Sequence, residues 1–182
     1  MLYHVSQTAG IQVLTPRVST HGKAYVYAVE NPVTGLLFGT RHDDFDFIIS
    51  SHDNIPVIYE CYPDAFHSIF NGKCCSIYEV REEGFQRGRT SWDAELVCEQ
   101  DVPVVRETAV NDLYSRLLTE EAGGRLILYQ YENSAEYKKR VSEHIVDRLI
   151  RFDALDIPDE RLQKHYGRII AELKHIMDGH LL

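Results

Sequence analysis

The chain has 182 residues and a formal net charge of −9, and 44% of its residues are hydrophobic. This length and apolar content predict one globular domain and exclude a disordered chain. The acidic charge disfavours nucleic acid and anionic membranes as partners, because both bind through Lys and Arg. We find neither the run of about 20 apolar residues of a transmembrane helix nor the basic start and apolar run of a signal peptide.

The number and spacing of the cysteines indicate whether a structural zinc site is expected and in which cellular compartment the protein would reside. The four cysteines, at positions 61, 74, 75 and 98, include no CxxC pair. Structural zinc sites commonly use such pairs, so we expect no structural zinc. Reduced thiols in a cytoplasmic protein are the expected state. Cys74 and Cys75 would point to opposite faces if they lie on a strand.

The first part of the chain predicts two strands followed by a helix. Residues 2–5 and 24–29 are short segments rich in Tyr and Val, which favour strands. Asn31 and Pro32 have the pattern of an N-cap and a first helical turn. The apolar residues that follow at helix-like spacing are Val33, Leu36, Leu37 and Phe38. A polar loop is expected over residues 41–46.

The middle of the chain predicts short strands with one more short helix. The expected strands cover residues 47–49, 55–61, 76–80, 95–98 and 102–105. A helix opens at Pro63-Asp64, and Asn71-Gly72 has the pattern of a left-handed helix stop. Residues 81–93 are charged and rich in Gly, which predicts a loop. Strands and helices that do not alternate regularly are typical of the α+β class.

The C-terminal third is mainly helical in its pattern. One amphipathic helix is predicted from Val110, Leu113, Tyr114, Leu117 and Leu118. A strand is expected over residues 125–131, and helices over 135–152 and 159–178. Their apolar stripes are Val141, Ile145, Val146 and Leu149 in the first, and Leu162, Ile169, Leu173 and Ile176 in the second. We therefore expect a single domain, 1–182, with a core in 1–106 and a mainly helical extension in 107–182.

The two N-terminal strands resemble the opening of ADP-ribosyltransferases of the diphtheria-toxin and poly(ADP-ribose) polymerase class. Tyr3-His4-Val5-Ser6 is similar to the family's aromatic-His-Gly-Ser strand, and Tyr25-Val26-Tyr27-Ala28 is similar to its second strand, which bears Tyr and precedes a helix. Phe38 stands eleven residues after Tyr27, where the family often has a second Tyr. Glu95 stands near the start of a late strand, the place of the family's Glu. The layout is also similar to a family of uncharacterised bacterial proteins, over most of the chain.

This resemblance implies an α+β fold with a split, strongly bent antiparallel sheet that forms a cleft, and with C-terminal helices added to it. It implies NAD as a small-molecule substrate, with ADP-ribose transferred to an undetermined acceptor or NAD hydrolysed by water. The implied catalytic residues are Glu95 and His4. The implied NAD-binding residues are His4, Ser6, Tyr27 and Phe38, and no metal is implied.

Elementary chemistry gives each of these residue types a role. Cleavage of the nicotinamide–ribose bond passes through a sugar with oxocarbenium character, which the carboxylate of Glu95 would stabilise. The rings of Tyr27 and Phe38 would form two walls around nicotinamide. His4 would donate a hydrogen bond to a ribose hydroxyl, with its tautomer held by the backbone.

The pattern departs from the family at three points. Val5 replaces a Gly whose backbone meets the nicotinamide amide, and Phe38 lacks the hydroxyl of Tyr. Asp93 stands where arginine-modifying toxins have a second Glu or Gln, so that target class is not supported. Glu99 lies four residues after Glu95, on the same face of a strand, and competes with it for the acidic role.

Two other functions remain open from the sequence. The first is a non-catalytic binding module on the same fold, in which His4 and Glu95 would not meet one ribose. The second is an RNA 2′-phosphotransferase-like enzyme that recruits His21, Arg41 and His42, although the acidic charge disfavours RNA. Positions 43–46 hold three Asp residues, which would chelate a metal only weakly. The loop arginines, Arg81, Arg87 and Arg89, could clamp a diphosphate.

Overall fold

The computed structural model describes residues 1–18, 22–42, 45–90 and 92–151, together with four helical positions further on. These four positions are Lys164, Gly167, Ile170 and Ala171. The helix expected over 159–178 lies largely outside the described residues, as do its stripe residues Leu162, Ile169, Leu173 and Ile176.

None of the described helices is long and apolar enough to cross a membrane. Fourteen elements follow one another along the described chain. In chain order they are β1 (Leu2–Ser6), β2 (Val13–Leu14), β3 (Arg17–Val18), β4 (Ala24–Val29), α1 (Pro32–Leu36), β5 (Phe47–His52), β6 (Ile55–Glu60), α2 (Ala65–Phe70), β7 (Cys75–Val80), β8 (Glu95–Cys98), β9 (Val102–Val110), α3 (Leu113–Ala122), β10 (Ile127–Tyr129) and α4 (Ala135–Arg151).

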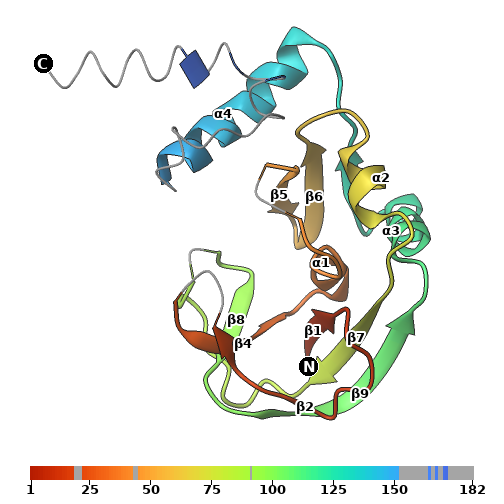
Figure 1. Ribbon diagram of the computed structural model, residues 1–182, viewed down its shortest axis with the longest axis vertical. Helices are drawn as coiled ribbons and strands as arrows, with labels where there is room; N and C mark the ends of the chain where they lie inside the picture. Colours follow the sequence, from red (N-terminus) through yellow and green to blue (C-terminus); the bar gives the residue numbers. More distant parts are fainter. Residues whose placement is uncertain are drawn as a thin grey trace, which may run out of the picture. The chain divides into compact units, whose positions relative to one another are not determined.

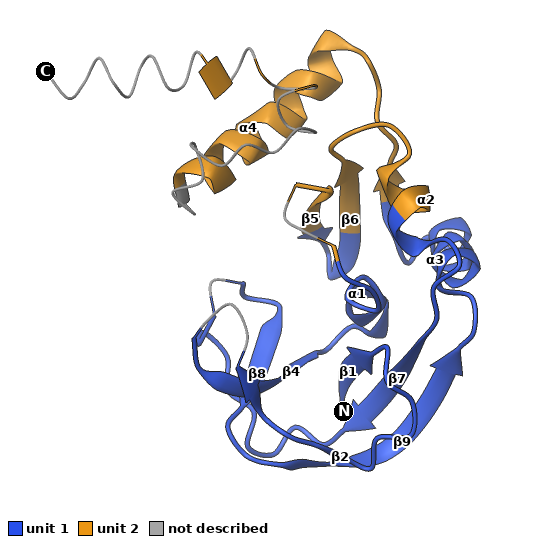
Figure 2. Ribbon diagram, viewed as in Figure 1, with its two compact units in different colours: residues 1–41, 51–56, 69–127 blue, residues 42–50, 57–68, 128–182 orange. Residues whose placement is uncertain are grey.

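These elements form two compact units (Figure 2). Unit 1 comprises residues 1–41, 51–56 and 69–127, and unit 2 comprises residues 42–50, 57–68 and 128–182. The sequence suggested a helical extension from residue 107, but β9 runs through that position as a strand.

Unit 1 is built on a strongly curled antiparallel sheet (Figure 1). The strand order is β2-β9-β7-β1-β4-β3, and β8 pairs with β4 off this path. Neighbouring strands of the path are mostly far apart in the sequence, so long-range pairing rather than hairpins builds the sheet. The α+β class predicted from the sequence is confirmed.

The curled sheet buries apolar side chains on both of its faces. Side chains alternate between faces along each strand, and directly opposed residues of an antiparallel pair share a face. We call the first the core face; its apolar cluster is Leu2, Leu14, Val26, Ala28, Tyr78, Val80, Leu96, Cys98 and Val102. We call the other the helix face, because α1 packs against it: a Cβ placed on Gly35 would meet Val5 Cγ2 at 3.0 Å and Val29 Cγ2 at 3.4 Å.

Local signals predicted most helix boundaries correctly. Asn31 caps α1, with its Oδ1 accepting a hydrogen bond from the Val33 backbone N–H at 2.8 Å. Gly72 follows α2 with a φ of 67°, the left-handed stop expected from the sequence. Val110, however, ends β9 and does not open the next helix. Helix α3 begins at Leu113 instead, where Asp112 accepts a hydrogen bond from the Ser115 N–H.

Unit 2 has its own apolar cluster, to which α4 contributes one side. Val141, Ile145 and Leu149 of the predicted stripe are buried in it, together with Ile48, Cys61, Tyr137 and Ile170. The buried carboxylate of Glu60 accepts hydrogen bonds from the backbone N–H groups of Phe66 and Tyr131, at 2.7 and 2.8 Å. Such a satisfied buried carboxylate stabilises the unit because none of its oxygens is left without a donor.

Candidate functional site

Tyr27 and Glu95 lie together on the helix face of two adjacent strands. In the β4–β8 pair, Tyr27 is opposed to Val97, and Val29 is opposed to Glu95. Tyr27 and Glu95 are therefore diagonal neighbours on one face, a relation that places residues about 7–8 Å apart. Tyr27 also packs edge-on against the buried ring of Tyr25, with 5.9 Å between centroids, which orients its own ring.

A second aromatic pair, Phe38 and Trp92, is connected to Glu95 through the segment that precedes β8. Phe38 follows α1, remains 43% exposed, and packs against Trp92 with 5.3 Å between ring centroids. Trp92 lies three residues before Glu95, the first residue of β8, and its carbonyl accepts a hydrogen bond from the Glu95 N–H at 3.1 Å. We call Tyr27, Phe38, Trp92 and Glu95 the aromatic site. Trp92 was not among the residues expected from the sequence, although it is the only Trp of the chain and lies three residues before the expected acid.

His4 does not join this group. Tyr3 and Val29 are directly opposed across β1 and β4 and so share the helix face with Tyr27. His4 follows Tyr3 along β1 and therefore points to the core face, where it opposes Tyr78 of β7. The expected meeting of His4 and Glu95 on one ribose is thus not found, because alternation along β1 separates them.

The hydrogen bond made by His4 also changes its expected role. Its Nδ1 lies 2.7 Å from the carbonyl oxygen of Tyr27, which can only accept. Burial is the main cause that lowers the pKa of His4, which keeps the ring neutral at pH 7. A neutral ring that donates from Nδ1 has an unprotonated Nε2. His4 can therefore accept a hydrogen bond at Nε2 but cannot donate one there, whereas a donor to ribose was expected from the sequence.

Ser6 also points to the core face, where a polar network fixes the segment after β1. Its Oγ accepts a hydrogen bond from the Thr8 N–H at 3.1 Å. The Glu107 carboxylate accepts hydrogen bonds from the Gly10 N–H at 3.0 Å and from the Ser76 hydroxyl at 2.6 Å. The Tyr78 hydroxyl donates to the Thr8 carbonyl oxygen at 2.6 Å. These groups satisfy one another, which indicates a structural role rather than a ligand site.

The departures from the family pattern have structural counterparts. Val5 lies on the helix face and packs against α1 at Gly35, so its side chain serves the contact between helix and sheet. Glu99, the competing acid, follows β8 and pairs with Lys23, whose Nζ lies 2.6 Å from its carboxylate. This exposed pair gives Glu99 a partner away from the aromatic site, so Glu95 is the acid that we retain.

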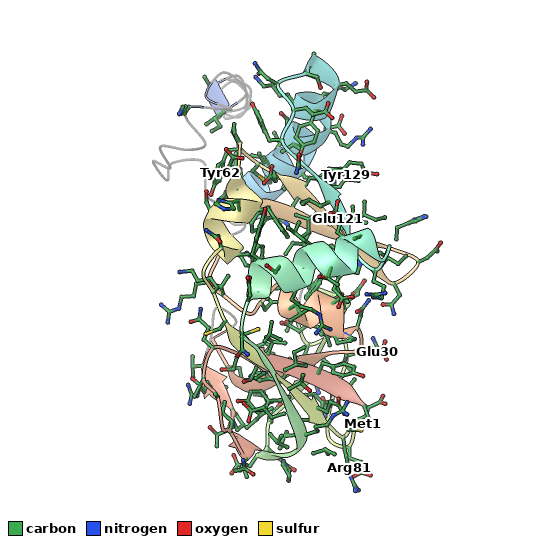
Figure 3. All side chains as sticks on the ribbon, turned by 90° about the vertical axis from the view of Figure 1, so that its right-hand side faces the viewer. Met1, Glu30, Tyr62, Arg81, Glu121 and Tyr129 are labelled. Carbon is green, nitrogen blue, oxygen red and sulfur yellow. The ribbon has the colours of Figure 1, made fainter. Side chains whose placement is uncertain are left out.

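The loop over residues 81–93 is attached to the sheet by its own arginines. Arg87 forms an ion pair with Glu30, and Arg89 donates to the Gln86 side chain at 2.8 Å. Gln86 in turn pairs with Val97 through both backbone groups. Arg81 is exposed and extends outward, as does Glu30 (Figure 3). The expected diphosphate clamp thus has two of its arginines already engaged with protein groups.

Two groups of residues remain: those named for the 2′-phosphotransferase-like alternative and the Asp residues named for weak metal binding. His21 lies outside the described residues, Arg41 is exposed at the end of a stretch of unit 1, and His42 packs against Phe47 within unit 2 at 5.6 Å between centroids. Of the three Asp residues, Asp46 is described: it is buried and accepts a hydrogen bond from the Tyr62 hydroxyl. Among the described residues, no cluster of His, Cys, Asp and Glu could hold a metal ion.

The four cysteines differ in their exposure. All four cysteines are free; Cys74 is exposed and Cys75 is buried on β7. Burial raises the pKa of Cys75 to about 11, which removes its thiolate at neutral pH. Cys75 is therefore not proposed as a nucleophile.

No family model, no curated protein and no solved structure matches the chain.

Proposed function

We propose that the chain binds NAD through the aromatic site of unit 1, with the nicotinamide ring against Tyr27, Phe38 and Trp92 and the adjacent ribose beside Glu95. The observation that carries this proposal is the β4–β8 register, which brings Tyr27 and Glu95 to one face. Nicotinamide in NAD is a planar cation, and such rings favour aromatic faces and a nearby carboxylate.

The proposal includes an ADP-ribosyltransferase-like division of the sheet. β1 opposes β7 along its whole length, from Leu2 to Ser6, but it pairs with β4 at Tyr3 alone among the described residues. The side chain of His4 spans to the Tyr27 carbonyl next to that position. This arrangement supports a sheet that opens between β1 and β4, with His4 as a positioning residue for the strand that bears Tyr27.

The proposed reaction breaks the C–N bond between ribose and nicotinamide. Nicotinamide leaves with the bonding electron pair, and an acceptor hydroxyl or water supplies the new bond to the ribose carbon and gives up a proton. Glu95 would stabilise the positive charge that develops on the sugar.

Titration with NAD tests the binding step directly. The single Trp of the chain lies in the proposed site, so its fluorescence should change as NAD binds, and calorimetry should give the same dissociation constant. Tyr27→Ala should weaken binding at least tenfold, because it removes one stacking face. Glu99→Gln is the matched control and should leave binding unchanged. A wild-type protein that binds no NAD at millimolar concentration would overturn the proposal.

A non-catalytic binding module is the second candidate, and the placement of His4 favours it. His4 and Glu95 point to opposite faces, so the pair cannot act together on one ribose. Nicotinamide release separates the two candidates. Turnover that is lost in Glu95→Gln, while NAD still binds, supports the transferase. NAD binding without any nicotinamide release from the wild type supports the module.

A further inference from the structure

The outer edge of β9 has room for another strand. β9 runs from Val102 to Val110 and pairs with β7 along one edge up to Val110. On its other edge β2 opposes Pro103 and Val102, and Gln12 accepts a hydrogen bond from the Val104 N–H. Within the described part of the chain, no strand pairs with that outer edge over residues 106–110. β9 is at the right of the curled sheet in Figure 1, so this side faces the viewer in Figure 3.

Two common protections against edge pairing, a proline and a bulge, lie in the other half of the strand, whereas Arg106 and Glu107 are the charged residues of this half. Pro103 lacks an N–H, and the register shift between Glu79 and Val80 leaves Val105 as an extra residue that bends β9. Residues 106–110 contain neither proline nor a bulge. Thr108 and Ala109 are small and exposed, so a second backbone can approach them closely. Extended N–H and C=O groups at such an edge are satisfied best by another extended strand.

We propose that a second copy of this chain pairs antiparallel with this edge, with a two-fold axis passing through Thr108. An antiparallel pair of identical strands has two-fold symmetry, so one edge can serve both copies. Because opposed residues must share a face, the axis passes through a residue and its own mate. This register also opposes Arg106 to Val110 and Glu107 to Ala109 of the second copy.

Charge and strand length select Thr108 over its neighbours. An axis at Arg106 or Glu107 would oppose like charges directly, which destabilises a sheet pair. An axis at Ala109 would extend the pairing to Asn111, beyond the end of β9 at Val110. An axis at Thr108 opposes two threonines, which is a favourable cross-strand pair, and uses all of residues 106–110.

Thr108→Lys tests the interface, since it would oppose two ammonium groups across the axis. Sedimentation equilibrium should show a dimer for the wild type and at least a tenfold weaker association for Thr108→Lys. Thr108 is exposed, so the melting temperature of a dilute sample should stay the same. A wild type that is monomeric up to millimolar concentration, or a dimer that Thr108→Lys leaves intact, overturns the proposal.

A disulfide test then fixes the register. In a Cys74→Ser background, which removes the exposed thiol, Thr108→Cys should crosslink to its own mate under mild oxidation. Ala109→Cys is the matched control, because residue 109 opposes Glu107 of the second copy and not itself. Crosslinking of Thr108→Cys well above that of Ala109→Cys supports the proposal, and equal crosslinking of the two variants overturns it. This test uses no NAD, so its outcome is independent of the proposed function.

Discussion

The two faces of the curled sheet use polar and aromatic residues in different ways. On the core face, Glu107, Tyr78 and Ser76 hydrogen-bond to one another and to the segment after β1. Tyr27 and Glu95 share the helix face near β8, and Phe38, which follows α1, remains half exposed against Trp92. Polar groups that satisfy each other stabilise a fold, whereas exposed aromatic rings beside an acid can contact a ligand. The polar network of the core face therefore serves stability, and the helix face near β8 is where we propose that a ligand binds.

The largest stability effect is expected where α1 and α3 approach the helix face. Gly39→Ala would place a Cβ 2.9 Å from Cys75 Sγ and 3.0 Å from both Leu113 Cδ2 and the Leu36 carbonyl oxygen. Such overpacking should lower the free energy of unfolding by about 1–3 kcal/mol, as measured by urea denaturation. Gly35→Ala is the milder comparison, because its closest contact is a single methyl group of Val5. An unchanged midpoint for Gly39→Ala would contradict this packing.

Two tyrosine-to-phenylalanine changes contrast the faces directly. Tyr78→Phe removes the hydroxyl that donates to Thr8 and accepts from the Ile11 N–H at 3.4 Å, and should cost roughly 1 kcal/mol in unfolding free energy. Tyr25→Phe, on the helix face, keeps the ring contacts with Tyr27 and Lys23 and should change stability much less. Denaturation of the two variants side by side gives the difference. Equal losses of unfolding free energy in the two variants would contradict the different roles of the two faces.

The pH dependence of stability should follow Glu107 on the core face. Hydrogen bonds from Ser76 and Gly10 lower the pKa of Glu107 below its ordinary value of 4.5. Folding therefore favours the ionised form, so its contribution is complete above pH 4.5 and is lost as the pH falls through the lowered pKa. The stability difference between wild type and Glu107→Gln should be largest near neutral pH and should shrink in acid. Melting temperatures across this range test it, and a difference that grows in acid would contradict the hydrogen-bonding pattern.

The smallest effect is expected at the exposed pair of Glu99 and Lys23. Exposed ion pairs in high dielectric contribute little to stability. Glu99→Gln should leave the melting temperature unchanged within error, and raising the salt concentration should not reveal a difference from wild type. A clear loss of stability would show that Glu99 does more than pair with Lys23 at the surface.

Much of the local structure could be predicted from the sequence, because its signals act over a few residues. Asn31 and Pro32 begin α1, Gly72 follows α2, and Val141, Ile145 and Leu149 face the apolar cluster of unit 2, as expected. The prediction failed at Val110, where helix-like spacing was mistaken for the start of a helix. Val110 pairs with Cys75 of β7 and therefore belongs to a strand. The side chain of Asp112 caps α3, which begins at Leu113.

In the candidate site, the sequence predicts the residue types and their elements but not the sheet face to which each residue points. The residue types of His4, Tyr27, Phe38 and Glu95, and their places on strands or beside a helix, follow from the sequence alone. The face to which each points depends on the pairings Tyr3 with Val29 and Val29 with Glu95, which join segments far apart in the chain. Alternation along a strand is local, but strand partners and register are set by long-range packing. Tertiary structure alone therefore separated His4 from Glu95 and brought Trp92 beside Phe38.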